Sequence, residues 1–119
     1  MIDKITQASL LYDFYGQLLT RRKQQVMELY HEENLSLSEI AEEFGISRSA
    51  VYESLKTAEK SLAEYEEKLG LVSRFLRSGE AFRKIDRMLD DLSARYAGDE
   101  ALTGSLSEIK AVISGLEED

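Results

Sequence analysis

The chain has 119 residues and a net charge of −8, from fifteen basic and twenty-three acidic side chains. That length and the 43% apolar content suit one small protein with a single core. With no cysteine and one histidine, disulfides, thiolate metal sites and cysteine nucleophiles are excluded, so we expect no cofactor and no metal site. No apolar run approaches the roughly 20 residues that span a bilayer, and the N-terminus lacks the order of a signal peptide, which predicts a cytoplasmic protein.

The chain contains no proline, and its apolar residues recur at intervals of three and four, which predicts an all-α fold. We expect a first helix that ends before Thr20, with Thr20 as the N-cap of a second helix. The first turn of that second helix holds Arg21, Arg22 and Lys23, which are unfavourably placed for the helix dipole. This basic cluster is either an outward-facing phosphate contact or a solvated surface patch.

The segment 36–56 is the most informative part of the chain. Ser36 followed by Glu39 indicates a capping box at the start of a third helix. Gly45 suits the positive φ at the end of that helix, and Ser47 can cap the next helix after a turn of about three residues. The small and apolar residues that support a helix-turn-helix from behind are also present: Ile40, Ala41, Phe44, Ile46, Val51 and Leu55. We therefore predict a helix-turn-helix in this segment.

In a helix-turn-helix, the exposed face of the second helix enters the major groove of DNA. Here the cap and the exposed positions are Ser47, Arg48, Ser49, Tyr52, Glu53 and Lys56. Arg48 suits phosphate or guanine and Lys56 suits phosphate, whereas Glu53 accepts a hydrogen bond only from cytosine. Four further cations are candidates for phosphate contacts: Arg21, Arg22, Lys23 and Lys60. Because glutamates lie among these cations, the same face could instead serve a protein partner.

The second helix of the motif is predicted to continue to Gly70, because its apolar residues alternate at four and three as far as that glycine. Beyond it, a heptad seam indicates a long fifth helix: Phe75, Phe82, Ile85, Leu89, Leu92 and Tyr96. Gly79 weakens this helix and could kink or break it. A last helix is expected over residues 99–116, followed by a disordered acidic tail at 117–119.

These elements predict a helix-turn-helix core over residues 1–70 and a helical extension over residues 71–119. The seam of the extension can pack within the chain, which is the usual outcome for such stripes. Leu76 and Met88 lie beside the seam and leave a second apolar strip for another subunit. We therefore favour a homodimer formed through the long C-terminal helices, which would also double the number of DNA contacts.

The pattern contains no catalytic constellation. Neighbouring carboxylates such as Glu42–Glu43 and Glu66–Glu67 do not share a helix face, so we interpret each pair as solvated surface. His31 is the single histidine and the chain has no cysteine, so no second side chain of these types could form a site with it. The seven glycines are not clustered in a loop of the kind that binds nucleotide phosphates. We expect no enzymatic activity.

Residues 18–62 resemble the promoter-reading fourth region of bacterial sigma factors. The resemblance rests on Leu19-Thr20, which opens a helix, and on Ser36–Ala41, which leads to Gly45–Arg48. The fold that it implies is all-α, in the sigma region 4-like and winged-helix-like class of DNA-binding proteins, without a wing and here with long C-terminal helices.

A second resemblance covers more of the chain. The segments Tyr12–Thr20, Leu35–Leu37, Ile46–Tyr52 and Tyr65–Leu69 are similar to the YlxM family of helix-turn-helix proteins from Gram-positive and related bacteria. Genes of that family usually lie beside the gene for the GTPase of the signal recognition particle or of its receptor. The resemblance therefore implies a regulatory part in co-translational protein targeting.

The sequence supports two functional hypotheses. The first is a helix-turn-helix regulatory protein that binds DNA through Arg48, Ser49, Tyr52 and Lys56 and takes part in the signal recognition particle pathway. The alternative is an acidic interaction module that modulates the GTPases of that pathway without binding DNA. The net charge of −8 favours a basic partner of this second kind.

Overall fold

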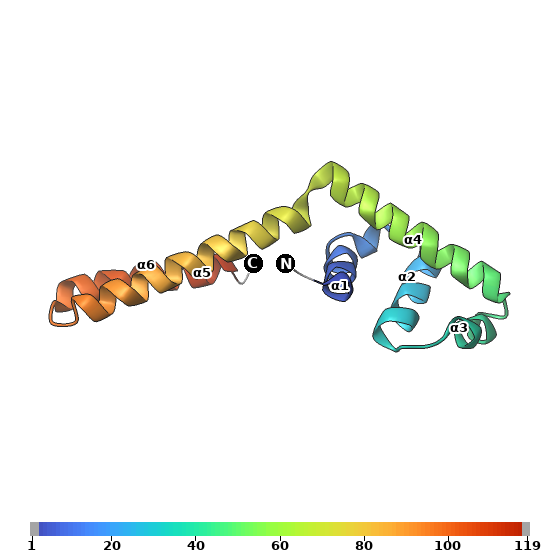
Figure 1. The fold of residues 1–119 in the computed structure, drawn as a ribbon, viewed down its shortest axis with the longest axis horizontal. Coiled ribbons are helices and arrows are strands. Elements are labelled where there is room, and N and C mark those ends of the chain that lie inside the picture. The colour runs from blue at the N-terminus through green and yellow to red at the C-terminus, as the bar shows by residue number, and fades with distance from the viewer. Residues whose placement is uncertain (1–2, 118–119) are drawn as a thin grey trace. The chain divides into compact units, whose positions relative to one another are not determined.

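A computed structural model describes residues 3–117 of the chain (Figure 1). The described residues contain no strand and form six α-helices: α1 (Lys4–Tyr15), α2 (Arg21–Met27), α3 (Leu37–Phe44), α4 (Arg48–Leu69), α5 (Leu71–Arg95) and α6 (Glu100–Glu117). The all-α fold predicted from the sequence is confirmed. The structure divides after Val72 into two compact units.

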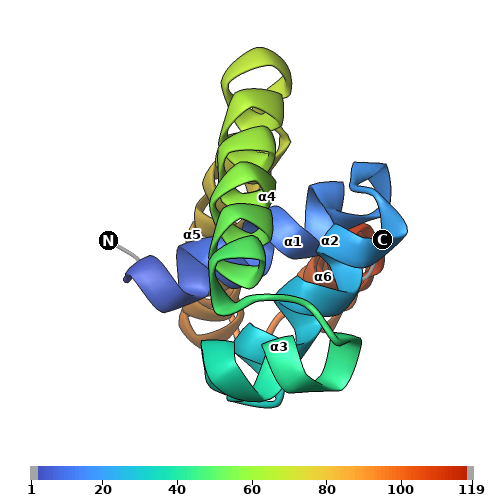
Figure 2. The ribbon, with the colours of Figure 1, turned by 90° about the vertical axis from the view of Figure 1, so that its right-hand side faces the viewer.

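In the first unit, α4 is the central element, and α1, α2 and α3 each pack against it (Figure 2). Buried side chains from all four helices form the core: Tyr15, Val26, Met27, Ile40, Ala41, Val51, Leu55, Ala58 and Leu62. Burial of each large apolar side chain stabilises the fold by roughly 1.5–3 kcal/mol. The buried residues of α4 recur at intervals of three and four, so one face of this helix supports the whole unit.

The helix boundaries predicted from local signals are confirmed. The hydroxyls of Thr20 and Ser47 each accept a hydrogen bond from an amide in the first turn of α2 and α4, respectively. At α3 the capping box is complete, because Ser36 Oγ accepts from the Glu39 amide while the Glu39 carboxylate accepts from the Ser36 amide. α4 runs unbroken to Gly70, which has a left-handed φ of 63°.

The first helix ends before Thr20, as expected: α1 ends at Tyr15, and the chain passes into a 3-10 turn (Gly16–Leu18). The Gly16 carbonyl accepts hydrogen bonds from the Leu19 amide at 3.1 Å and from Gln24 Nε2 at 2.9 Å. These bonds tie the turn to α2 and end the α-helical hydrogen-bonding pattern. A Cβ atom at Gly16 would lie 3.0 Å from the Tyr12 ring, so the turn also depends on a small residue.

The second helix changes geometry near its end. It passes from α2 into a π-helical turn (Glu28–Glu32), and Asn34 then adopts a left-handed φ of 56°. This path brings His31 Nε2 within 3.8 Å of Glu59 Oε2 on α4. The contact joins two distant segments, and no local sequence pattern predicts it.

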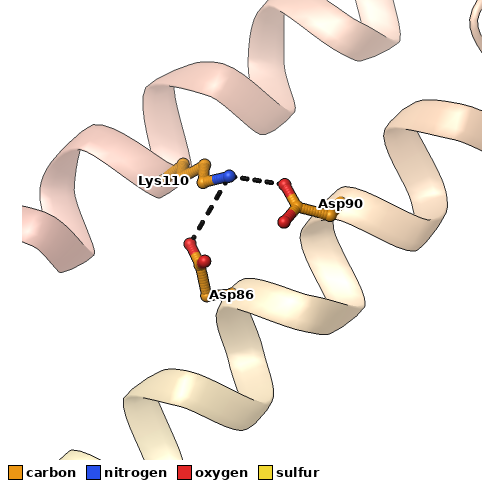
Figure 3. Close-up of polar contacts among 3 residues, drawn as sticks. All are labelled: Asp86, Asp90 and Lys110. Atoms are coloured by element: carbon orange, nitrogen blue, oxygen red, sulfur yellow. Dashed lines mark hydrogen bonds and ion pairs between the residues drawn. The ribbon is translucent and has the colours of Figure 1, made fainter.

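The second unit contains the antiparallel helices α5, beyond Val72, and α6. Leu89 on α5 and Leu106 on α6 are buried. The Lys110 ammonium on α6 lies 3.6 Å from an Asp86 carboxylate oxygen and also donates a hydrogen bond to Asp90, and both aspartates are on α5 (Figure 3). One buried apolar pair and one exposed ionic cluster therefore mark where the two helices meet.

The ends of these helices test three further expectations. α5 is continuous through Gly79, so that residue does not break it. α6 begins after Asp99, close to the expected start, and the Asp99 carboxylate accepts from the Leu102 amide at 3.1 Å. The disorder expected at the acidic tail is wrong for Glu117, which is the last residue of α6, while residues 118 and 119 lie outside the described part of the chain.

Candidate nucleic-acid interface

The turn between α3 and α4 is built around Gly45, which has a left-handed φ of 65°. The Ile46 amide donates to the Ala41 carbonyl at 3.0 Å, which closes the end of α3 in a Schellman-type arrangement. Ser47 then caps α4, so three residues separate the two helices, as predicted. Together these residues form a helix-turn-helix.

The face of α4 that we predict to contact DNA is exposed. Val51 and Leu55 are buried on the opposite side and fix the rotation of the helix. All six predicted contact residues are exposed: Ser47, Arg48, Ser49, Tyr52, Glu53 and Lys56. Lys56 Nζ lies 5.5 Å from the centre of the Tyr52 ring, a cation–π distance that orders this pair of side chains.

The electrostatics of the motif are mixed. Within residues 3–117, Arg48 and Lys56 make no ion pair with a carboxylate, so both cations can meet an anionic ligand. On α3, a shallow cavity of about 360 Å³ is lined by Leu35 and three glutamates, Glu39, Glu42 and Glu43. Hydrogen bonds from Ser36 lower the pKa of Glu39, which keeps that carboxylate charged. A phosphate would therefore be attracted to the start of α4 and repelled from α3.

The four cations predicted as additional phosphate contacts have different surroundings. The Arg22 guanidinium lies 4.4 Å from the centre of the Phe44 ring, so it packs α2 against α3. Arg21, Arg22 and Lys60 are exposed, whereas Lys23 is half-buried. Arg21 and Lys60 are thus the members of this set that are exposed and do not pack on Phe44.

A polar junction at the far end of α4 was not predicted. The buried Tyr15 hydroxyl donates to Glu66 Oε1 at 2.6 Å and accepts from the Leu71 amide at 3.1 Å. The same Glu66 oxygen accepts from the Val72 amide at 3.0 Å, and burial together with the Glu66 hydrogen bond raises the pKa of Tyr15. Interpreting the pair Glu66–Glu67 as solvated surface is therefore wrong for Glu66, which caps the start of α5. No sequence signal could have revealed this, because 51 residues separate the partners.

Residues 3–117 contain neither a candidate metal site nor a helix that could span a membrane. No group of three His, Cys, Asp or Glu side chains is placed to hold a metal ion. No helix in this part of the chain is both long and apolar enough to cross a membrane. The chemistry available at the motif is that of hydrogen bonds, cations and an aromatic ring.

A family model described as "Putative helix-turn-helix protein, YlxM / p13 like" (UPF0122) matches residues 2–99. The chain belongs to this family. A UPF0122 protein of Desulforamulus reducens is 46% identical over 103 residues, which cover 85% of this chain and 88% of the relative. UPF0122 proteins of Geobacillus kaustophilus and Lactococcus lactis subsp. cremoris are 39% and 40% identical, over 92% and 93% of this chain and 96% and 94% of the relatives.

Membership in the YlxM/p13-like family confirms the resemblance found in the sequence. The family is described as one of helix-turn-helix proteins. Its match spans the helix-turn-helix and α5 and ends at Asp99, the cap of α6. The likeness to the fourth region of sigma factors stays a prediction.

Proposed function

We propose that this protein is a regulatory helix-turn-helix protein that binds DNA, with the first half of α4 as its recognition helix. The observation that supports the proposal is a row of exposed residues on the face of α4 opposite its buried side: Arg48, Ser49, Tyr52 and Lys56. A short, capped turn from α3 fixes the direction in which this row points. An exposed polar row on a rigid second helix is the feature by which helix-turn-helix proteins contact base edges.

Each side chain of the row suits a different part of DNA. Arg48, in the first turn of α4, can bond a guanine edge or a phosphate. Tyr52 offers its ring to a thymine methyl group and its hydroxyl to a hydrogen-bond partner, while Lys56 can neutralise a phosphate. Glu53 accepts from the cytosine amino group and repels other acceptors, so it would restrict the sequences that are bound.

The number of accessible cations sets the affinity of one copy. Arg48, Lys56, Arg21 and Lys60 would supply about four phosphate contacts, each adding about −0.9 to the slope of log affinity against log salt. About four phosphate contacts are few for a protein that binds a specific DNA sequence. Two copies on one duplex would double the contacts and the salt dependence.

We infer that two copies pair through the second unit. Apolar side chains are exposed along one stripe of each helix: Ile85, Met88 and Leu92 on α5, with Tyr96 just beyond its end, and Ile109, Val112 and Leu116 on α6. Met88 is 56% and Val112 67% exposed, and a contiguous apolar face of this kind marks an interaction surface. α5 carries six basic and four acidic residues, whereas α6 carries one basic and three acidic residues. A second copy that lays its α5 on this α6 covers both stripes and brings opposite charges together.

Fluorescence anisotropy with labelled duplexes tests the DNA proposal. The full chain is titrated against random-sequence duplexes and against a pool of genomic fragments at about 50 mM salt, where phosphate contacts are strongest. The double variant Arg48→Ala, Lys56→Ala should bind at least about tenfold more weakly, because a lost base contact alone costs about 1–3 kcal/mol. Lys68→Ala removes one charge from the far end of α4 and should bind like the wild type. Equal affinity of the double variant and the wild type, or no binding to any duplex, would overturn the proposal.

A second candidate function follows from the family resemblance and the charge of the chain. We propose as the alternative that the protein modulates the GTPases of the signal recognition particle pathway without binding DNA. The net charge of −8 and the glutamates on α3 favour a basic partner. Adding the purified protein to GTPase assays of the particle and its receptor tests this alternative. A change in hydrolysis supports it, and an unchanged rate without complex formation contradicts it.

A further inference from the structure

A cavity of about 500 Å³ opens between α1, α2 and α4 in the first unit. Its apolar floor is formed by Ala8 and Leu11 on α1, Met27 on α2 and Leu62 on α4. Met27 and Leu62 are buried core residues, so the floor is part of the packed interior. The polar residues at its edge are Asp3, Lys4, Gln7 and Glu59. The cavity is shaped to receive apolar side chains within a polar border.

A second hollow, of about 130 Å³, shares Ala8 and Met27 with the first. Tyr12 and Glu28 line it, and so does Ile5, whose side chain is 82% exposed. Both hollows adjoin α1 and share Ala8 and Met27, and we call them together the α1 groove. Their lining runs along α1 from Asp3 to Asp13, over about 15 Å or roughly three helical turns.

The rim of the α1 groove is acidic. Five carboxylates line the two hollows, against the single lysine Lys4 and the imidazole of His31: Asp3, Asp13, Glu28, Glu32 and Glu59. The Tyr12 hydroxyl donates to Glu28 Oε1 at 2.9 Å. Burial, this hydrogen bond and the charges of Glu28 and Glu32 raise the pKa of Tyr12 to about 12. The rim therefore repels phosphate and attracts cations.

We propose that the α1 groove binds a basic amphipathic helix of a partner protein. Apolar side chains at the spacing i, i+3 or i+4, i+7 would occupy the floor, and flanking lysines or arginines would face the carboxylates of the rim. The length of the groove matches such a row of anchors, whereas a small cationic molecule would touch only a part of it. This binding site uses none of the residues on the DNA-binding face, so it stands or fails independently of the proposed DNA function.

The probe is a fluorescein-labelled peptide of about 18 residues, made of leucine and lysine, with the leucines at helical spacing. One matched peptide replaces every lysine by glutamate, and another keeps the composition but scrambles the helical period. The full chain should bind the amphipathic basic peptide at least about tenfold more tightly than either matched peptide. Shifts of amide NMR signals on binding should centre on Ala8, Met27 and Leu62.

Variants of the full chain locate the site. Glu59→Lys reverses one rim charge and Ala8→Met fills the floor, and each should weaken binding of the peptide about fivefold or more. Glu43→Lys makes the same charge change on α3 and should leave the affinity unchanged. Thermal unfolding followed by circular dichroism verifies that each variant is folded.

Several results would overturn the proposal. Glu59→Lys and Ala8→Met could bind the peptide as tightly as the wild type, or the scrambled peptide could bind as well as the amphipathic one, which would indicate charge attraction alone. NMR shifts confined to α3 or to the second unit would place the peptide elsewhere. Shifts in the α1 groove caused by tetrabutylammonium, without any binding of the peptide, would assign the groove to small cationic molecules instead of a helix.

Discussion

The Tyr15 hydroxyl donates a hydrogen bond to Glu66 Oε1 across 2.6 Å, which joins the end of α1 to the last turns of α4. Both side chains also bond the first amides of α5, at Leu71 and Val72. Amides at the start of a helix have no partner within the helix, so side chains must satisfy them. In this chain the cap comes from two residues that are far from each other in the sequence.

Removing the carboxylate of this cap should destabilise the first unit. Glu66→Ala is expected to lower the free energy of unfolding by about 1 kcal/mol, the size of a typical helix cap. Glu67→Ala changes the neighbouring exposed residue and should stay within about 0.5 kcal/mol of the wild type. Urea unfolding followed by far-UV circular dichroism compares the three proteins. Equal stability of Glu66→Ala and Glu67→Ala would show that the cap contributes nothing.

The capping box of α3 should make stability depend on pH. Hydrogen bonds from Ser36 lower the pKa of Glu39 below its ordinary value of 4.5, so the unfolded chain binds this proton more readily than the folded one. The resulting stabilisation is present above pH 4.5 and is lost as the pH falls through the lower pKa of the folded state. Glu39→Gln can keep the capping hydrogen bonds but does not titrate.

The stability of Glu39→Gln should therefore fall less than that of the wild type between about pH 5 and pH 3. Urea unfolding at the two pH values measures both proteins. Parallel losses of stability in the two proteins would contradict the role given to the Glu39 carboxylate.

Two glycines should respond to alanine with opposite signs. Gly45 has a φ of 65° at the turn of the motif, so Gly45→Ala is expected to cost about 1–2 kcal/mol of stability. Gly104 lies inside α6, and no atom lies within 4 Å of where its Cβ would stand, so Gly104→Ala should stabilise by about 0.5–1 kcal/mol. Thermal unfolding of both variants compares them with the wild type. A stabilising Gly45→Ala would contradict the left-handed turn.

The salt dependence of DNA binding should count the phosphate contacts of the motif. If Arg48 contacts phosphate, Arg48→Ala reduces the slope of log affinity against log salt by about 0.9, while Lys68→Ala leaves the slope unchanged. Anisotropy titrations between about 50 and 200 mM salt give the slopes. An unchanged slope with a lower affinity would indicate that Arg48 contacts a base edge and not a phosphate.

Charges in the apolar stripes of the second unit should prevent pairing. Met88→Glu with Val112→Glu would place carboxylates where a second copy covers the stripes, and burial of unpaired charges is costly. Light scattering is expected to give twice the chain mass for the wild type and the single chain mass for the double variant. Ser107→Glu adds a charge at an exposed position outside the stripes and should leave the dimer intact. A wild type with the mass of one chain would contradict the dimer.

The parts of the fold that could be predicted depend on contacts between near neighbours in the chain. The caps at Thr20, Ser36 and Ser47 and the turn at Gly45 involve amides only a few residues away, so their signals lie within a short segment. The hydrogen bond between Tyr15 and Glu66 joins helices that meet only after folding. A single sequence contains the two side chains but no sign of their approach.

The same distinction applies to the candidate site. The exposed row on α4 could be predicted because the apolar period fixes the buried face, and the opposite face must then meet solvent. The contact of Arg22 with the Phe44 ring could not, because it depends on how α2 and α3 pack.

The heptad seam of α5 indicated a face of the helix but not what covers it. Leu89 is buried within the second unit and Phe82 is half-buried. The remaining members of the seam are exposed: Phe75, Ile85, Leu92 and Tyr96. A period in the sequence reports that a stripe is apolar, and the structure is needed to show which of its residues are buried.

α4 is a single helix of 22 residues, about 33 Å long, that carries the DNA-binding row at its start and part of the α1 groove in its middle. Lys56 and Glu59 are three residues apart, so the two proposed binding surfaces are neighbours along one rod. A helix held in the groove and a duplex on the row would crowd each other, yet the cations of that helix would also ease the repulsion between the acidic rim and phosphate. Steric crowding would thus weaken simultaneous binding of the two ligands, whereas the cations of the bound helix would strengthen it. Salt screens the electrostatic effect but not the steric one. Raising the ionic strength would therefore make binding of one ligand disfavour binding of the other.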